Sequence, residues 1–351
     1  MVLWRCLLCF IAGCLVALVG SCTPAFATDQ LPIVDGEFYV AAQEWAESPG
    51  PRSVRATIHF PQGLITNISG STGLMLILHN WGGQGCEGAA NPRTMADSFD
   101  VVAICVDYLQ SGSEGMGPRA YDFGLLQAVD ALRVLRHVFV SLNVARIKFH
   151  RGRIYAVGAS GGGLVALMAN KLAPRTFAGV LAMAPLVKLS EDIALGLPGN
   201  SPLNARWGAL PPEHAEIRFV GNPGHLKAMR KLKTQAQVVL VHGVNDRIAP
   251  FEETQELHGL MELARLPVTP FWVTAQQLDG LVFSDDAHTL GHRTLISIAA
   301  GSTILRAVRK GKTDFERRDT SVRYTVTGGS WTVNHRGAAS VSFTRKRSSR
   351  R

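Results

Sequence analysis

The chain has 351 residues, of which 46% are hydrophobic and 18% are charged. This composition supplies a sizeable core and excludes a globally disordered protein. The net charge of +9 would suit nucleic-acid binding, but five positive charges lie in residues 345–351 and another, Arg5, lies in the N-terminal segment. We therefore expect residues 345–351 to form a solvated basic tail. We expect no nucleic-acid partner, because no aromatic-rich binding motif accompanies the charge.

The N-terminal segment has the pattern of a secretory signal peptide. An apolar run over residues 6–20 follows Arg5 and leads to an A-x-A cleavage site at residues 25–27. The run is shorter than the roughly 20 residues of a membrane-spanning helix, so we predict cleavage after Ala27 and an exported protein. Residues 19–22, VGSC, also resemble a bacterial lipobox, in which acylation of Cys22 would attach the protein to a membrane. The sequence leaves both destinations open: a periplasmic or extracellular protein, and a membrane-anchored lipoprotein.

Cys86 and Cys105 lie beyond this leader. An oxidising compartment would permit a disulfide between them. We favour free thiols instead, because Cys105 stands in VVAICVDY, a predicted buried strand in which a thiol packs as a small apolar group.

The chain after the leader predicts strands that alternate with helices. Two early segments, residues 37–45 and 53–65, alternate apolar and polar residues and predict antiparallel strands. Continuous apolar runs predict buried strands at residues 73–80, 100–109, 154–157, 177–186, 236–243 and 268–275. Helical spacing predicts helices at residues 121–142, 161–172, 251–266 and 294–311. This order indicates an α/β fold with a mostly parallel central sheet and helices on both faces.

Two segments depart from the alternation. Residues 187–235 are rich in Pro, Gly and Asn, and we interpret them as an insertion over the carboxyl edge of the sheet, either a lid or a surface excursion. Residues 314–344 contain short strand patterns separated by Gly-Gly and Arg-Gly turns, which predict a small appended β segment. The predicted order is a signal peptide at 1–27, a main domain at 28–313, this β segment, and the basic tail.

Residues 158–162, GASGG, have the G-x-S-x-G pattern between a predicted strand and a predicted helix. This is the arrangement of a nucleophile elbow, in which a strained turn exposes the serine hydroxyl and glycines let the strand and helix approach. A phosphate-binding turn is the alternative, but it needs a lysine or a G-x-G-x-x-G spacing that is missing here. We therefore predict that Ser160 is a nucleophile.

The loop HNWGGQG, residues 79–85, follows the first buried strand. Acyl transfer needs backbone N–H groups aimed at the developing oxyanion. One is expected from Gly161, the residue after the nucleophile, and the other from Trp81 or Asn80. We interpret His79 as a structural histidine that is hydrogen-bonded to the backbone.

Two further loops follow the last two predicted core strands. In HGVNDRIAP, residues 242–250, Asp246 occupies the place of a catalytic acid that orients a histidine, although a turn-capping aspartate is the alternative. In DDAHTLGHR, residues 285–293, His288 is the predicted general base and His292 is its competitor. Asp285 or Asp286 could instead cap the following helix. The order Ser160, Asp246, His288 is the one expected of an α/β-hydrolase triad.

These motifs resemble the α/β-hydrolase superfamily over about residues 73–310. GASGGG together with HGVNDRIAP is most similar to prolyl-oligopeptidase-type catalytic domains and related exported bacterial esterases. The resemblance implies an α/β-hydrolase fold and a covalent acyl-enzyme mechanism without a cofactor or metal. Two departures stand out: Asn80 and Trp81 follow His79 where many relatives have two glycines, and His288 lies in DDAHT rather than in a Gly-His-Gly setting.

The sequence supports three functions. The first is an exported serine hydrolase that cleaves a carboxylic ester, small or polymeric, through Ser160, Asp246 and His288. The second is a serine peptidase of the prolyl-oligopeptidase type. The third is a binding protein that has the hydrolase fold without its activity. The histidines lack ligand spacing such as H-E-x-x-H, so we expect no metal.

Overall fold

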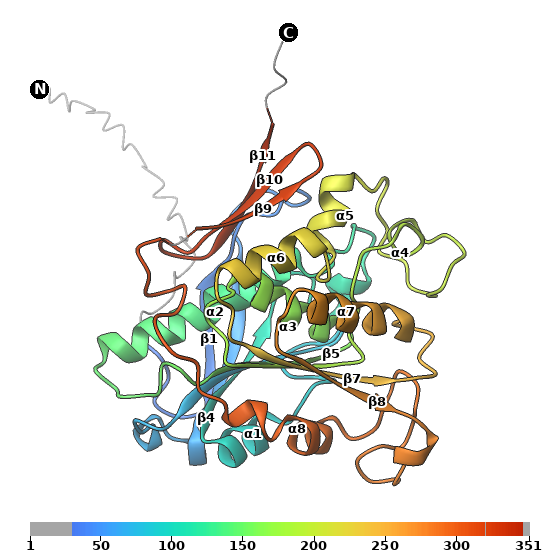
Figure 1. Ribbon diagram of the computed structural model, residues 1–351. Helices are drawn as coiled ribbons and strands as arrows, with labels where there is room; N and C mark the ends of the chain where they lie inside the picture. The colour runs from blue at the N-terminus through green and yellow to red at the C-terminus, as the bar shows by residue number, and fades with distance from the viewer. Residues whose placement is uncertain (1–29, 320, 347–351) are drawn as a thin grey trace, which may run out of the picture.

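An eight-stranded mixed sheet runs through the centre of the computed structural model, which describes residues 30–319 and 321–346 (Figure 1). The strand order is β1-β2-β4-β3-β5-β6-β7-β8. The bounds are β1 Gly36–Ala41, β2 Ser53–His59, β3 Gly73–Leu78, β4 Val101–Asp107, β5 Ile154–Ala159, β6 Gly179–Met183, β7 Gln237–Gly243 and β8 Val268–Val273. Strand β2 is antiparallel to both β1 and β4, and the pairs from β4 through β8 are parallel. The predicted α/β-hydrolase sheet is confirmed.

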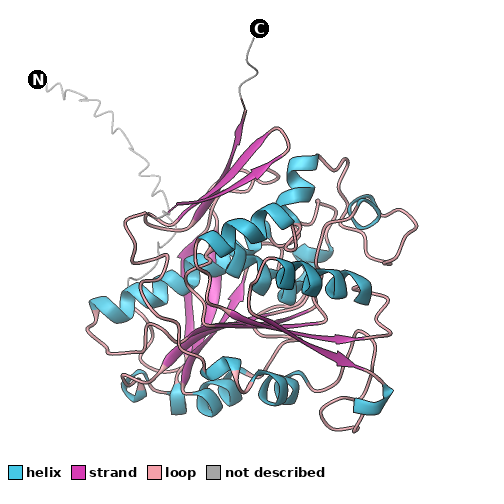
Figure 2. Cartoon of the chain, viewed as in Figure 1, coloured by secondary structure: helices cyan, strands magenta, loops and turns pink. Residues whose placement is uncertain are grey.

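Helices cover both faces of this sheet (Figure 2). Helices α1 (Pro92–Phe99) and α8 (Arg293–Gly301) lie on one face, and α2 (Leu125–Val144), α3 (Gly161–Leu172), α6 (Pro223–Lys231) and α7 (Phe251–Leu263) lie on the other. The apolar side chains of the strands divide accordingly into two buried cores, one under each helix layer. None of the described helices has the length and hydropathy needed to span a membrane.

The predicted helix over 294–311 is too long. Helix α8 ends at Gly301, and a 3-10 turn, Ile304–Arg306, follows. A Cβ at Gly301 would lie 2.8 Å from Leu305 Cδ1, so the chain turns back tightly there. Ile304 and Leu305 are both buried in the core under α8 as a result. Packing against the sheet therefore overrides the helical spacing.

The segment 187–235 forms three helices: α4 (Glu191–Leu195), α5 (Pro212–Arg218) and α6. Helix α6 lies against α3 and α7 and connects β6 to β7, so it belongs to the helix layer of the sheet. The part before α5 runs past the end of β7, and the Ser201 hydroxyl donates to the Ile248 carbonyl at 2.6 Å. Only that part lies at the carboxyl edge, so the predicted insertion over 187–235 is too long: its last helix, α6, belongs to the main fold.

The C-terminal strands β9 (Ser321–Val326), β10 (Gly329–Asn334) and β11 (Ser340–Arg345) form a separate antiparallel sheet. This sheet packs on α5 and α6 (Figure 1). Hydrogen bonds fix it to the main body, including His335 Nε2 to the Leu172 carbonyl at 3.0 Å and Trp331 Nε1 to the Glu213 carbonyl at 3.0 Å. The predicted appended β sheet is confirmed. The predicted signal peptide and the lipobox at Cys22 lie outside the described residues.

Candidate active site

Ser160 occupies the turn between β5 and α3, with φ 55° and ψ −123°. A non-glycine residue rarely adopts such a positive φ, and the strain exposes the hydroxyl at the start of the helix. Close packing fixes this turn: a Cβ at Gly158 would overlap the Gly162 carbonyl oxygen, and a Cβ at Gly162 would overlap the Leu78 carbonyl oxygen. Only glycine fits either position, which agrees with the role predicted for these two residues.

A hydrogen-bond chain connects three loops at the carboxyl edge of the sheet. His288 Nε2 lies 2.9 Å from Ser160 Oγ, and His288 Nδ1 lies 2.7 Å from Asp246 Oδ2. Asp246 follows β7 and His288 follows β8, while Ser160 follows β5. The structure therefore brings together the three residues that the sequence singled out. A neutral His288 would donate from Nδ1 to the carboxylate and accept from the serine hydroxyl at Nε2.

Asp246 is 2% exposed, and both of its carboxylate oxygens accept hydrogen bonds. Its Oδ1 accepts from the backbone N–H groups of Ile248 at 2.8 Å and Ala249 at 3.0 Å. Burial by itself raises the pKa of this carboxyl, but hydrogen bonds from His242 and His288 outweigh burial and hold the pKa below its usual range. Asp246 is therefore a fixed carboxylate at neutral pH.

His242 is the one residue of this network that the sequence interpretation missed. Its Nε2 lies 2.9 Å from Asp246 Oδ2 and 2.9 Å from the Ala249 carbonyl oxygen. Because both atoms can only accept, Nε2 carries the hydrogen. The ring is fully buried, and its Nδ1 has no hydrogen-bond partner in the described part of the chain. Asp246 Oδ2 is therefore shared by two histidines.

The alternatives in the 285–293 loop lie elsewhere. His292 is the N-cap of α8, where its side chain accepts from the Leu295 N–H. Asp285 accepts from the Ala287 N–H, and Asp286 accepts from the Asn245 side-chain amide. The suggestion that either aspartate caps the helix is therefore wrong, since the loop turns before α8 begins. Arg293 holds the loop by donating to the His288 carbonyl at 2.7 Å.

The backbones of Gly161 and Trp81 lie close together beside Ser160. A Cβ at Gly161 would lie 3.0 Å from the Trp81 nitrogen, so the amides of Gly161 and Trp81 are neighbours. Neither amide has an intramolecular acceptor among the described residues. The Asn80 N–H instead donates to the Glu87 carbonyl at 3.4 Å. Of the two alternatives for the second oxyanion donor, Trp81 fits and Asn80 does not.

His79 is a structural residue, as predicted. It is fully buried, its Nδ1 donates to the Asn80 carbonyl at 2.7 Å, and its Nε2 lies 2.6 Å from Ser111 Oγ. Burial lowers the pKa of His79 to about 4, so the ring is neutral. The Ser111 hydroxyl donates to the Tyr108 carbonyl at 2.6 Å. The ring also stacks on Tyr108 at 3.9 Å between centroids. These contacts hold the start of the loop that carries Trp81.

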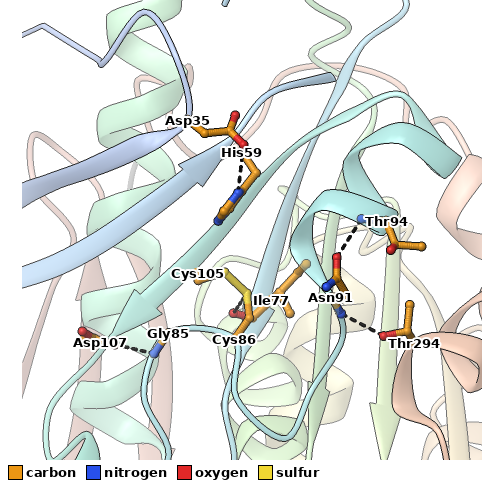
Figure 3. The surroundings of a disulfide bond; sticks show 10 residues. All are labelled: Asp35, His59, Ile77, Gly85, Cys86, Asn91, Thr94, Cys105, Asp107 and Thr294. Atoms are coloured by element: carbon orange, nitrogen blue, oxygen red, sulfur yellow. Dashed lines mark hydrogen bonds and ion pairs between the residues drawn. A yellow bond between two sulfur atoms is a disulfide. The ribbon is translucent and has the colours of Figure 1, made fainter. Parts of the chain in front are cut away.

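A disulfide joins Cys86 to Cys105, with the two Cα atoms 5.1 Å apart (Figure 3). Our expectation of free thiols was wrong. Glycines in the 79–87 loop fold it back over β4, where the Gly85 N–H donates to the Asp107 carboxylate. The end of the loop is thereby placed beside the strand that holds Cys105. The disulfide anchors the Trp81 loop to the sheet.

Replacing both cysteines with serine is expected to destabilise the protein by about 3 kcal/mol, because the bridge closes a loop across a sequence separation of 19 residues. Urea unfolding of the double variant and of the wild type, each at neutral pH without reductant, measures the difference. Wild type treated with dithiothreitol should match the variant. Equal midpoints for the untreated wild type and the variant would contradict the prediction.

A cavity of about 1230 Å³ adjoins the Asp246 turn, and neither Ser160 nor His288 lines it. The segment 196–204 forms one wall, and the other consists of the Asp246 turn and the first turn of α7. Its lining includes Glu253, whose pKa burial and nearby carboxylates raise to about 7 although Lys188 opposes the shift. Among the described residues, no cluster of histidine, cysteine, aspartate or glutamate has an arrangement that could hold a metal ion.

Comparisons place this architecture among known folds. Residues 141–298 match the model of the prolyl oligopeptidase family. An acylaminoacyl peptidase from Pyrococcus horikoshii is 12% identical, with a TM-score of 0.53 over 82% of this chain and 43% of that chain. Dipeptidyl peptidase 4 from Porphyromonas gingivalis is 14% identical, with a TM-score of 0.53 over 78% of this chain and 36% of that chain.

A truncated carbohydrate esterase from gut microbiota is 11% identical, with a TM-score of 0.50 over 78% of this chain and 97% of that chain. The present chain thus spans less than half of either peptidase and nearly all of the esterase. A search of curated proteins found no significant match. At these identities the solved structures share the fold of this chain, and the family match supports a hydrolase of the serine peptidase or esterase type.

Proposed function

We propose that this α/β-hydrolase, whose core resembles the prolyl-oligopeptidase-type catalytic domain, is an exported serine hydrolase that cleaves carboxylic esters through an acyl-enzyme. The observation that carries the proposal is the hydrogen-bond chain from Asp246 through His288 to Ser160. Its two distances, 2.7 and 2.9 Å, lie within the range of a working nucleophile and base.

In the acylation step, Ser160 Oγ attacks the ester carbonyl carbon while its proton moves to His288 Nε2. The imidazolium is stabilised by the Asp246 carboxylate at Nδ1. The carbonyl oxygen becomes an oxyanion beside Ser160, where the N–H groups of Gly161 and Trp81 can donate to it. Collapse of this intermediate breaks the bond to the alcohol, which takes the proton from His288.

In the deacylation step, water attacks the acyl-enzyme with His288 as general base. The proton passes from the water to Nε2 and then to Ser160 Oγ as the acid leaves. The same two N–H groups receive the second oxyanion. Apart from the water and the substrate, every group in these steps belongs to this chain.

A peptidase is the second candidate, and the match to the prolyl oligopeptidase family favours it. We place ester hydrolysis before peptide hydrolysis on chemical grounds. The alcohol of an ester is a better leaving group than the amine of an amide, and a serine that is activated enough to attack amides also attacks esters. The likeness to a carbohydrate esterase over almost its whole length agrees with this order. The 1230 Å³ cavity reaches Asp246 but not Ser160, so for either reaction we propose that it receives a part of the substrate away from the bond that is cleaved.

Export is the part of the proposal that rests on sequence and on the disulfide. The leader over residues 1–27 carries the signal pattern. The Cys86–Cys105 bridge agrees with it, because disulfides persist mainly in oxidising compartments. Acylation at Cys22 remains our alternative route to the same compartment, with the protein then held on a membrane.

Labelling by a fluorophosphonate probe tests the proposal. We expect wild type to be labelled, Ser160→Ala to show no label, and His288→Ala to be labelled at least 10³-fold more slowly, about the loss expected when a general base is removed. Circular dichroism of each variant checks the fold. A folded wild type that takes no label would overturn the proposal and favour the binding protein. Parallel assays with p-nitrophenyl esters and p-nitroanilide amides then separate esterase from peptidase.

His242→Phe is expected to slow labelling by between about 10-fold and 100-fold. The change removes one hydrogen bond to the Asp246 carboxylate, and a bond to a charged group contributes about 1.5–3 kcal/mol. The KM for an ester substrate should change little, because His242 is fully buried. His258→Phe, a change on the outer helix α7, is the control. A His242→Phe enzyme with wild-type kcat would contradict the proposed contribution.

A further inference from the structure

A second, strongly basic cleft lies at the opposite edge of the sheet from Ser160. It has a volume of about 400 Å³ and eleven lining residues, seven of them basic and one, Asp319, acidic. Its residues come from the segments just before β6 and β7 and from residues 309–319. Because these segments meet the amino ends of parallel strands, while Ser160, Asp246 and His288 follow carboxyl ends, the cleft is separate from the candidate active site.

Four lysines supply the free charge of this cleft: Lys231, Lys233, Lys310 and Lys312. All four are exposed, and no hydrogen bond or ion pair within residues 30–319 and 321–346 occupies their ammonium groups. They come in two pairs from segments far apart in sequence. Gln235 joins the segments, because its side chain donates to the Lys310 carbonyl at 3.0 Å and accepts from the Lys310 N–H at 2.9 Å.

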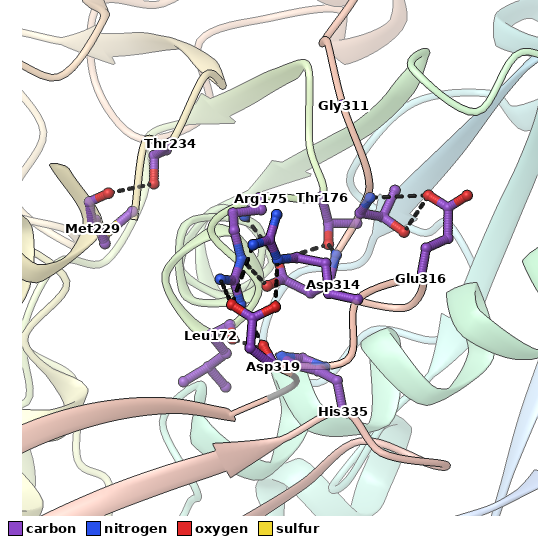
Figure 4. A network of polar contacts seen from close by, with 12 residues as sticks. Leu172, Arg175, Thr176, Met229, Thr234, Gly311, Asp314, Glu316, Asp319 and His335 are labelled. Atoms are coloured by element: carbon purple, nitrogen blue, oxygen red, sulfur yellow. Dashed lines mark hydrogen bonds and ion pairs between the residues drawn. The ribbon is translucent and has the colours of Figure 1, made fainter. Parts of the chain in front are cut away.

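Buried arginines build the floor beneath these lysines. Arg309 donates to the carbonyl oxygens of Thr176 at 3.1 Å and Gly311 at 2.8 Å, which fixes the 309–311 turn. Arg175 lies between the carboxylates of Asp314 and Asp319, at 2.7 and 3.2 Å (Figure 4). The arginines are therefore used within the fold, and the four lysines stand on a fixed frame.

We propose that this cleft binds a linear phosphate-bearing polymer that carries no aromatic bases. Four like charges around one hollow repel one another, and a polyanion would both relieve the repulsion and gain entropy from the counterions it releases. A hollow of 400 Å³ is much larger than one phosphate and has lysines on two sides, which suits a chain. Its lining has no aromatic residue on which a nucleobase could stack.

The inference does not depend on the proposed hydrolysis. A polymer bound at this edge leaves the Ser160 edge open, so the cleft would attach the enzyme to an anionic polymer while another molecule is cleaved. Binding should therefore leave fluorophosphonate labelling unchanged. This independence lets failure of the cleft be distinguished from failure of the candidate active site.

Fluorescence anisotropy with end-labelled inorganic polyphosphate tests the inference on the full-length mature chain. We expect binding that weakens with salt, and a double variant, Lys233→Gln/Lys312→Gln, that binds at least tenfold more weakly. The slope of log Kd against log salt should fall by about two, since each lysine–phosphate contact contributes about one. Arg265→Gln/Arg336→Gln is the control, because it removes two exposed charges outside the cleft.

Three results would overturn the inference. One is equal weakening in the cleft and control variants, which would indicate nonspecific attraction to net charge. Another is loss of binding in Arg347→Gln/Arg350→Gln/Arg351→Gln but not in the cleft variant, which would assign the polymer to the C-terminal tail. The third is equally tight, cleft-dependent binding of single-stranded DNA, which would assign the site to nucleic acid.

Discussion

Asp246→Asn is expected to lower kcat/KM for an ester substrate by about 10⁴-fold, the loss typical of a triad whose histidine is held in the wrong tautomer. An asparagine can present its amide N–H to His288 Nδ1, which then must accept and leaves Nε2 protonated toward Ser160. The serine would lose its proton acceptor. Initial rates with a p-nitrophenyl ester measure the loss.

Asp285→Asn is the matched control, because this neighbouring aspartate accepts only a local backbone N–H and lies outside the chain to Ser160. We expect its activity within twofold of wild type. Comparable losses of activity in the two variants would show that negative charge near the site, rather than the Asp246–His288 contact, decides the rate.

Asp246→Asn should also change the stability of the protein, by an amount that depends on pH. The pKa of Asp246 is held below its usual range, because hydrogen bonds from His242 and His288 outweigh burial. A depressed pKa in the folded state gives stability that is present above the unfolded pKa of about 4 and is lost as pH falls through the folded value. The stability difference between wild type and Asp246→Asn should therefore be larger at neutral pH than at about pH 3. Urea unfolding at both values measures it, and an increase toward acid would contradict the assignment.

The sheet could be predicted because its signals are local. The runs that became β3 and β4 are continuously apolar, as burial on both faces requires. The G-x-S-x-G pattern is local too, because its five residues are contiguous, although Gly162 is restricted by the neighbouring strand β3. The loops with Asp246 and His288 follow neighbouring strands β7 and β8, so chain order alone predicted where they would meet.

The features that the sequence did not yield depend on contacts between distant segments. Cys105 has the pattern of a buried strand thiol, and its pairing with Cys86 follows from how the intervening loop folds back. His242 stands in an apolar strand, and only the fold of the following turn brings Asp246 back to its ring. The choice between Asn80 and Trp81 needed the Asn80–Glu87 hydrogen bond, which the spacing does not encode.

Gly162→Ala is expected to destabilise the protein by about 4 kcal/mol or more, a range that single changes reach only through severe overpacking or strain. The added Cβ would overlap the carbonyl oxygens of Leu78 and His79, and both belong to backbone that cannot move without shifting β3. This overlap would push the start of α3 away from the loop after β3, so the Gly161 and Trp81 amides should separate. Any folded Gly162→Ala should therefore lose fluorophosphonate labelling as well as stability.

Gly259→Ala separates this steric effect from the general effect of removing a glycine. Gly259 lies within α7, and a Cβ there meets nothing within 4 Å. Alanine is favoured over glycine in a helix interior by about 1 kcal/mol, so this control should be slightly more stable than wild type. Urea unfolding and labelling of both variants give the comparison. A Gly162→Ala protein with wild-type midpoint and labelling would mean that β3 and α3 can move apart freely, and the nucleophile turn would then not depend on the close approach described for Gly158 and Gly162.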